Sequence, residues 1–242
     1  MLVTPDCRTA ISSGRMASTK VLHLPEVTRR LLLSESADSH KELRRIEVFS
    51  DGVFAIACTL LILEFRVPHP GDISVPDALW PALKTIWPSF VGYVLSFGAI
   101  LIAWAGHHRN FRLLIGSSKA FLYANGLLLL TITFIPFPTA VLAEYVTTPQ
   151  ANIAVMFYSA AFLAVSVGFN VCWLSVFRPI RLLSPHAGRA AVKRDTIQML
   201  SGLPAYAGTT VISYWFPMIG LAIIFGMELL WIVMTMTVAP GE

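Results

Sequence analysis

The residues best placed to do chemistry in this sequence are Ser50 and Asp51, which directly precede twelve uncharged residues, Gly52–Leu63. A helix that crosses a bilayer needs about 20 residues, so a span built on these twelve must carry Ser50 and Asp51 into or close to the hydrocarbon. A carboxylate at membrane depth costs on the order of 2.5–3.5 kcal/mol and normally faces protein or water. Asp51 is therefore the first candidate functional residue.

The apolar residues that follow share a face of the predicted helix. At about 100° per residue, Ile56, Leu60 and Leu63 fall within roughly 60° of one another. Gly52 and Thr59 border the same stripe. Such a stripe serves either packing between helices or the wall of a pore, where apolar side chains form a constriction. The carboxylate before it favours the pore wall, because a buried carboxylate needs water or a donor.

Other polar side chains lie at the ends of later apolar segments. Trp104 and His107 are three residues apart, so they share a helix face. One interpretation is an interfacial Trp with histidines that reach toward water. The alternative is that His107 donates a hydrogen bond inside the bundle, to Thr59 or to Asn125. His107 and His108 project about 100° apart, which disfavours a metal site built on the pair.

Arg45 precedes Asp51 by six residues, so the two do not share a helix face. Arg45 is either a positively charged anchor at the membrane surface or a partner for a neighbouring helix or subunit. The three cysteines, Cys7, Cys58 and Cys172, are widely scattered and show no metal-ligand spacing. The chain lacks the common nucleotide, hydrolase and metalloprotease motifs, so neither an enzyme nor a cofactor is expected.

The composition supplies the elements that must position these residues. Of 242 residues, 55% are hydrophobic and only 13% are charged, and the mean hydropathy is +0.67. Soluble domains are roughly a quarter charged, so we predict an all-α integral membrane bundle. Six spans are expected, at about 44–67, 88–107, 120–145, 153–177, 196–214 and 216–238. Residues 41–242 would form this domain, and residues 1–40 a disordered extension.

The charge distribution orients this bundle. Sixteen of the 18 Lys and Arg residues lie before or at the start of the first span, between the second and third, or between the fourth and fifth. Arg66 and Lys84 alone fall on the other side. The positive-inside rule therefore places both termini in the cytoplasm, with a multi-pass protein in the cell membrane. The net charge of +4 is too small to indicate a nucleic-acid partner.

Three motifs resemble the prokaryotic potassium channels of the transmembrane protein 175 family. They are Arg45-x-x-x-Phe49-Ser50-Asp51-Gly52-Val53-Phe54-Ala55-Ile56 in the first span, Trp104-x-x-His107-His108 at the end of the second, and Asn125 followed by Pro136-Phe137-Pro138-Thr139 in the third. They cover roughly residues 44–145, and the first is the most specific.

The resemblance implies a homotetramer in membrane lipid, whose four first spans line a passive pore for K⁺. The constriction residues it implies are Ile56, Leu60 and Leu63, with Thr59 as the threonine tied to potassium preference. Its structural motif at the pore mouth consists of Arg45, Phe49, Ser50 and Asp51. Its supporting hydrogen-bond network consists of Trp104, His107 and Asn125. No metal is expected beyond the permeant ion.

A different class of function stays open from the residues alone. Ionisable side chains inside membranes also serve as proton relays, so Asp51 and His107 could belong to a proton-coupled secondary transporter. Transporters often carry Gly/Pro interruptions at matching places in two halves. Here the pair Pro136 and Pro138 has only a loose counterpart at Pro204. The sequence therefore favours the channel.

Overall fold

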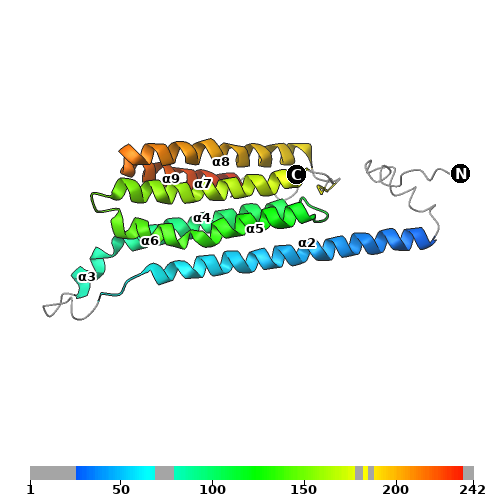
Figure 1. The fold of residues 1–242 in the computed structure, drawn as a ribbon, viewed down its shortest axis with the longest axis horizontal. Coiled ribbons are helices and arrows are strands. Elements are labelled where there is room, and N and C mark those ends of the chain that lie inside the picture. Colours follow the sequence, from blue (N-terminus) through cyan, green and yellow to red (C-terminus); the bar gives the residue numbers. More distant parts are fainter. Residues whose placement is uncertain (1–25, 69–78, 178–181, 185–187, 237–242) are drawn as a thin grey trace.

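The protein is described by a computed structural model that covers residues 26–68, 79–177, 182–184 and 188–236. Within these residues the named elements are all helical (Figure 1). They are α2 (Glu26–Leu60), the short 3-10 helix η2 (Leu61–Glu64), α3 (Leu79–Thr85), α4 (Trp87–Phe111), α5 (Lys119–Phe134), α6 (Pro136–Tyr145), α7 (Ala151–Ser175), α8 (Arg189–Trp215) and α9 (Pro217–Met236).

These helices make six passes, by α2, α4, α5 with α6, α7, α8 and α9, that run alternately in opposite directions (Figure 1). Consequently α2 begins and α9 ends at the same end of the bundle. Five of the passes are long and apolar enough to cross a membrane. The remaining pass, α8, begins with Arg189 and carries Lys193, Arg194 and Asp195 in its second turn, but it packs against α7 and α9. The prediction of an all-α six-helix membrane bundle is confirmed.

The first helix is longer than expected. We predicted a disordered extension up to residue 40, but residues 26–40 form the first turns of α2. The physical reason is that a helix already nucleated by the membrane span extends at little cost. No Gly or Pro interrupts residues 26–51, so nothing in this stretch stops the helix. Residues 1–25 lie outside the described part of the chain.

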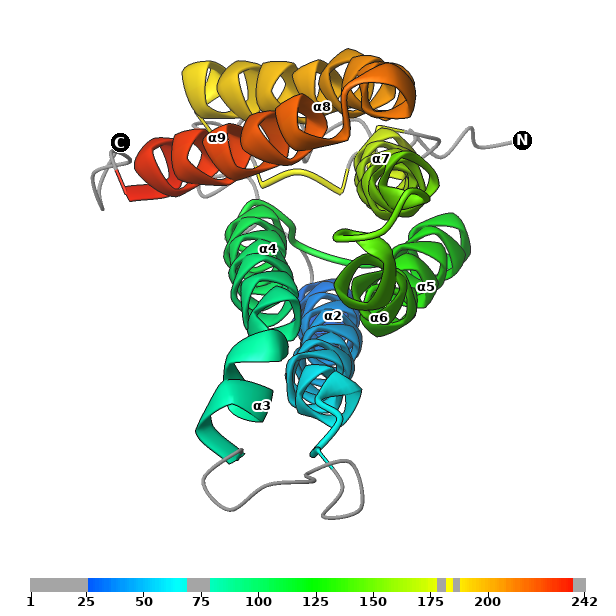
Figure 2. The same cartoon turned by 90° about the vertical axis from the view of Figure 1, so that its left-hand side faces the viewer.

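The helices are arranged in layers, with α2 on one side of the bundle and α8 and α9 on the other (Figure 2). Between them lie α4, α5, α6 and α7. Along its length α2 packs against α4 and α5, so a large part of its surface is left uncovered within one subunit. Just after η2, Arg66 forms a 3.5 Å ion pair with Glu144 at the end of α6.

The third pass bends at Ile135, between α5 and α6. Pro136 and Pro138 cause the break, because neither has a backbone N–H to continue the helical hydrogen bonds. The carbonyls that lose their donors are those of Ile132 and Phe134, and the Ile135 backbone N–H donates to the Ile132 carbonyl at 3.2 Å. The Thr139 backbone N–H then resumes the regular pattern by donating to the Ile135 carbonyl, also at 3.2 Å. Membrane helices tolerate prolines when freed carbonyls find such partners.

The core joins all layers and includes tight contacts between helices. Its fully buried large side chains include Phe54, Leu128, Ile132, Tyr158 and Ile224. Gly168 of α7 lies so close to α5 that a Cβ atom there would approach the Cα atom of Leu128 to 3.0 Å. This close approach is what small residues permit between membrane helices. This contact fixes the position of α5 against α7. Because α2 packs against α5, it also helps to position α2.

Candidate functional site: the exposed face of α2

The first helix presents two different faces. Ser50, Phe54, Ala57 and Leu61 are at most 2% exposed and point into the subunit. The opposite face is exposed along its whole length. In chain order its residues are Arg45, Phe49, Gly52, Ile56, Thr59, Leu60 and Leu63. All seven lie within roughly 60° of Ile56 on a helix with 100° per residue, so they form one stripe, which we call the α2 stripe.

The α2 stripe is apolar in its second half, where the sequence predicted a constriction. Ile56 is 57% exposed and Leu63 71%, whereas Leu60 is 38% exposed. The Thr59 hydroxyl donates to the Ile56 carbonyl at 2.8 Å. The oxygen of that hydroxyl therefore stays available as an acceptor on the exposed surface. Patches of this kind mark surfaces that meet another protein or a membrane.

A buried hydrogen-bonded bridge sets the orientation of α2. Asn125 of α5 donates from Nδ2 to Ser50 Oγ at 2.9 Å, and its Oδ1 lies 2.9 Å from His107 Nε2 on α4. Ser50 in turn donates to the Ile46 carbonyl at 2.8 Å. His107 is only 2% exposed. The bridge therefore ties three helices together in a place where no water competes for the bonds.

This geometry decides between the sequence-based alternatives for the two histidines. His107 contacts Asn125, not Thr59, which lies on the exposed side of α2. His108 points elsewhere: its Nδ1 lies 3.1 Å from Glu47 Oε1. The residues predicted from sequence as a supporting network, Trp104, His107 and Asn125, thus do lie near α2, although Trp104 belongs to a second, separate contact.

That second contact involves Asp51. Trp104 Nε1 donates to Asp51 Oδ1 at 2.9 Å, and the Trp104 ring stacks on the His108 ring with centroids 5.9 Å apart. Together with Glu47 these residues form a polar clasp between α2 and α4. Asp51 points roughly 140° away from Ile56 around the helix axis. Its carboxylate therefore faces the clasp and not the α2 stripe.

Arg45 and Phe49 stand apart from both contacts. They lie on the α2 stripe, within roughly 20° of Ile56, and Phe49 is 67% exposed. Among the described residues no ion pair involves Arg45. The four residues predicted at the pore mouth therefore divide into two pairs. Ser50 and Asp51 hold α2 within the subunit, whereas Arg45 and Phe49 point out of it.

Two acidic residues were missed in reading the sequence. Glu47 joins the clasp, and its spacing of four residues from Asp51, which places both on one helix side, could have revealed it. Glu228 is 6% exposed in α9. A single carboxylate within that apolar span meets the same criterion that singled out Asp51. In the described part of the chain, no three metal-ligating side chains gather in one place.

Comparison with known proteins decides the family. The family model described as the endosomal/lysosomal potassium channel TMEM175 matches residues 45–136, the segment that holds the α2 stripe and both contacts. A potassium channel of Chamaesiphon minutus is 43% identical over 178 residues, which are 74% of this chain and 87% of that protein. This chain belongs to the TMEM175 family.

Other members differ in how much they share and in their names. A potassium channel of Streptomyces collinus is 37% identical over 72% of this chain and 83% of its own length. The human relative, named an endosomal/lysosomal proton channel, is 41% identical over 83 residues, or 31% of this chain and 16% of that protein. The TMEM175 family is therefore a family of membrane-embedded ion channels, not an enzyme class.

The fold comparison agrees. The crystal structure of a lysosomal potassium-selective TMEM175 homologue from Chamaesiphon minutus superimposes with a TM-score of 0.73 and 37% identity, over 81% of this chain and 98% of that one. A second TMEM175 channel structure, of a Thr-to-Ala variant, matches with a TM-score of 0.52 at 18% identity and supports the fold alone. The resemblance noted in the sequence is confirmed.

Proposed function

We propose that this TMEM175 member is a passive, potassium-preferring cation channel. Four copies would surround a central axis, and α2 of each would line the pore. The observation that carries the proposal is the α2 stripe, an exposed face on a helix whose opposite face is anchored by buried hydrogen bonds. Two relatives of similar length are named potassium channels, which supports the same reading.

In this proposal the apolar end of the α2 stripe is the constriction. A fourfold ring of Ile56 would be the narrowest point, followed by rings of Leu60 and Leu63. Apolar rings of this kind control ion passage through the cost of removing water. Thr59 would place four hydroxyl oxygens between the first two rings, where they could replace part of the hydration shell of K⁺. The preference for K⁺ over Na⁺ is assigned to this part of the pore.

The two contacts beside the pore have a positioning role. The bridge through Asn125 would fix the rotation of α2, and the clasp through Asp51 and Trp104 would fix the cytoplasmic end of α2. Asp51 would brace the mouth more than concentrate cations there, because its Oδ1 already accepts a hydrogen bond from Trp104. Arg45 and Phe49, which point out of the subunit, are assigned to contacts between neighbouring subunits.

The proposed orientation follows from the charge distribution. With both termini in the cytoplasm, the first half of α2, including the extension before Arg44, projects from the cytoplasmic membrane face. The partners proposed are three further copies of the chain, membrane lipid and the permeant ion. No organic cofactor is proposed.

The test is reconstitution of the purified full chain into liposomes, with K⁺, Na⁺ and H⁺ fluxes measured separately. If the protein is such a channel, ion flux should follow the ion gradient without saturation, and K⁺ should pass faster than Na⁺. The mass of the detergent-solubilised protein should equal that of four copies. The proton measurement is included because the human relative is named a proton channel. A protein that runs as a monomer, or that shows no cation flux, would refute the proposal.

The rival function, a proton-coupled secondary transporter, finds less support. It needs Asp51 and His107 to exchange a proton, but Asp51 accepts from Trp104 whereas His107 is bonded to Asn125. The two side chains therefore belong to separate contacts. Saturable uptake driven by a proton gradient in the same liposomes would favour the transporter.

A further inference from the structure

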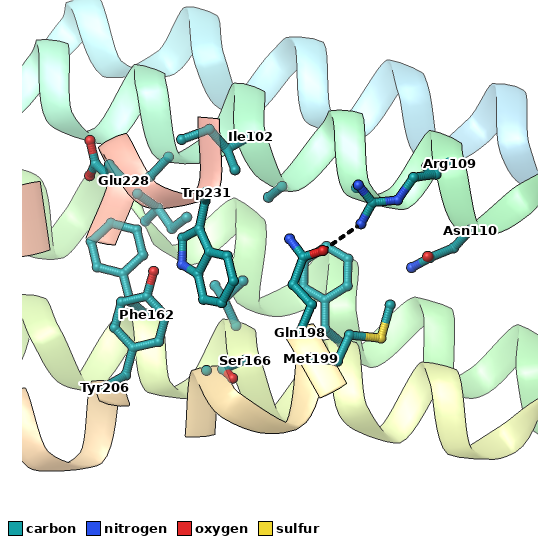
Figure 3. A pocket seen from close by; sticks show the side chains of 17 residues that line it. Ile102, Arg109, Asn110, Phe162, Ser166, Gln198, Met199, Tyr206, Glu228 and Trp231 are labelled. Atoms are coloured by element: carbon teal, nitrogen blue, oxygen red, sulfur yellow. Dashed lines mark hydrogen bonds between the residues drawn. The ribbon is translucent and has the colours of Figure 1, made fainter. Parts of the chain in front are cut away.

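A half-open cavity of about 120 Å³ lies between α4, α7, α8 and α9, with Ile135 at the α5–α6 junction also in its wall. It is on the far side of α4 from α2, so it is separate from the proposed pore (Figure 2). Figure 3 shows its two polar ends, Glu228 at one and Arg109 with Gln198 at the other, with Trp231 between them. The walls between these ends are mainly apolar and aromatic.

At the Glu228 end of the cavity, one oxygen of a buried carboxyl group lacks a hydrogen-bond partner among the described residues. This carboxyl group comes from the middle of α9, and the residue is 94% buried, with 6% exposed. Its Oε1 is inaccessible and has no hydrogen-bond partner among the described residues. An isolated buried carboxylate costs several kcal/mol unless a donor or cation meets it. The cavity is therefore a place where a positive ligand group would be stabilised.

The positive charge at the opposite end does not fill this role. Arg109 Nη2 donates to Gln198 Oε1 at 3.0 Å, and its Nε lies 3.5 Å from the buried Asp195 carboxylate. The guanidinium group is thus already engaged by Gln198 and Asp195, and Asp195 also pairs with Arg194 at 3.5 Å. Glu228 remains the one carboxylate among the residues that line the cavity.

The aromatic walls specify the kind of cation. Phe162 and Tyr206 stack with ring centroids 5.9 Å apart, and Trp231 lies beside them in the wall (Figure 3). Aromatic faces attract organic ammonium groups and surround their apolar parts. The volume is somewhat below the roughly 150 Å³ of an engineered cavity that holds benzene. A single ring therefore fills this volume, and a short arm on the ring requires a small widening of the walls.

From these contacts we propose that the cavity binds a small hydrophobic ammonium ion, a protonated aryl- or alkylamine. The ammonium group pairs with Glu228, and the apolar body lies against Phe162, Tyr206 and Trp231. The neutral form of such an amine dissolves in lipid and so reaches a site within the membrane. There it takes up the proton of the Glu228 carboxylic acid, so that the ammonium and the carboxylate form together. This binding does not depend on whether the chain conducts K⁺.

The test uses benzylamine as the probe and the full chain in lipid nanodiscs, with binding measured by isothermal titration. We expect one saturable site per subunit. Glu228→Gln should weaken binding at least about tenfold, because it removes one partner of a buried charge pair. Benzyl alcohol, the neutral analogue of similar shape, should bind the wild-type chain weakly. Asp51→Asn, which alters the carboxylate beside α2, should leave the affinity for benzylamine unchanged.

Each other outcome counts against the proposal. Equal binding of benzylamine and benzyl alcohol would mean simple partition into an apolar space. Loss of binding in Asp51→Asn with retention in Glu228→Gln would place the amine at the pore mouth. Because Glu228→Gln could fail to fold, Ala103→Leu provides a second variant, which narrows the cavity and keeps the carboxylate. Unchanged benzylamine binding in Ala103→Leu would overturn the proposal.

Discussion

Asn125 donates a hydrogen bond to Ser50 at 2.9 Å, and this contact joins α5 to the buried face of α2. The same amide meets His107 of α4 through its oxygen. One side chain therefore holds the pore-helix candidate against two neighbours. The face of α2 that points away from Asn125 is the one that carries Ile56.

We expect Asn125→Ala to change both stability and conduction. It removes two hydrogen bonds between helices, each contributing about 0.6 kcal/mol on average and up to about 2 kcal/mol in membranes. The thermal midpoint of the protein should fall, and the single-channel conductance should change because α2 loses its rotational anchor. Thermal unfolding in detergent and bilayer recordings measure the two effects.

Ser96→Ala is the matched control. Ser96 is buried and bonds Thr139 at 2.6 Å and Tyr158 at 2.9 Å, so its loss has a similar cost, but none of these residues contacts α2 through a hydrogen bond. We expect a lower thermal midpoint and an unchanged single-channel conductance. If both variants changed conductance alike, Asn125 would have no special role in orienting α2.

Two substitutions at Asp51 distinguish a structural role of its hydrogen bond to Trp104, which would hold α2 in place, from a role of its negative charge. Asp51→Asn keeps an oxygen that accepts from Trp104 Nε1 but removes the negative charge, whereas Asp51→Ala removes both. If Asp51 braces α2, the Asn variant should assemble and conduct nearly as wild type, and the Ala variant should lose tetramer or flux. The readouts are size-exclusion profiles and liposome K⁺ flux. A fully active Ala variant, or equal loss in both, contradicts bracing.

The sequence predicted much of this arrangement, for a physical reason. Membrane spans must satisfy their backbone internally, so apolar length and charge asymmetry were enough to place six helices. Helical periodicity was enough to place Ile56, Leu60 and Leu63 on one face. Asn125 could be named among the possible partners of His107, because few polar groups exist in the apolar spans.

What could not be predicted depends on contacts between distant segments. Nothing local to Glu47 shows that His108, 61 positions later, will lie 3.1 Å away. The helical state of residues 26–40 was missed because their polar composition resembles a disordered tail, although the adjoining span nucleates the helix. The cavity beside Glu228 arises from four helices, so no single segment could reveal it.

We expect Gly168→Ala to destabilise the bundle. A Cβ atom there would lie 3.0 Å from the Cα atom of Leu128, and backbone cannot move aside as a side-chain tip can. Overpacking of this kind costs about 1–3 kcal/mol. The control is Gly208→Ala, since a Cβ at that glycine meets nothing within 4 Å and Ala favours the helix. Thermal unfolding should show a drop for the first variant and none for the second.

The most direct test of the pore concerns Ile56. In the proposed tetramer, Ile56→Asn would replace a ring of four apolar side chains by amides that bind water, so the free-energy cost for an ion to pass the proposed constriction should fall. We expect larger K⁺ currents and a smaller preference for K⁺ over Na⁺, measured as reversal potentials in bilayers with opposing K⁺ and Na⁺ gradients.

Leu130→Asn is the control, because Leu130 is similarly exposed, at 66% against 57% for Ile56, but lies on α5. Its permeation should match that of the wild-type chain. Unchanged currents and selectivity in Ile56→Asn, or the same change in both variants, would mean that Ile56 does not face the ion path.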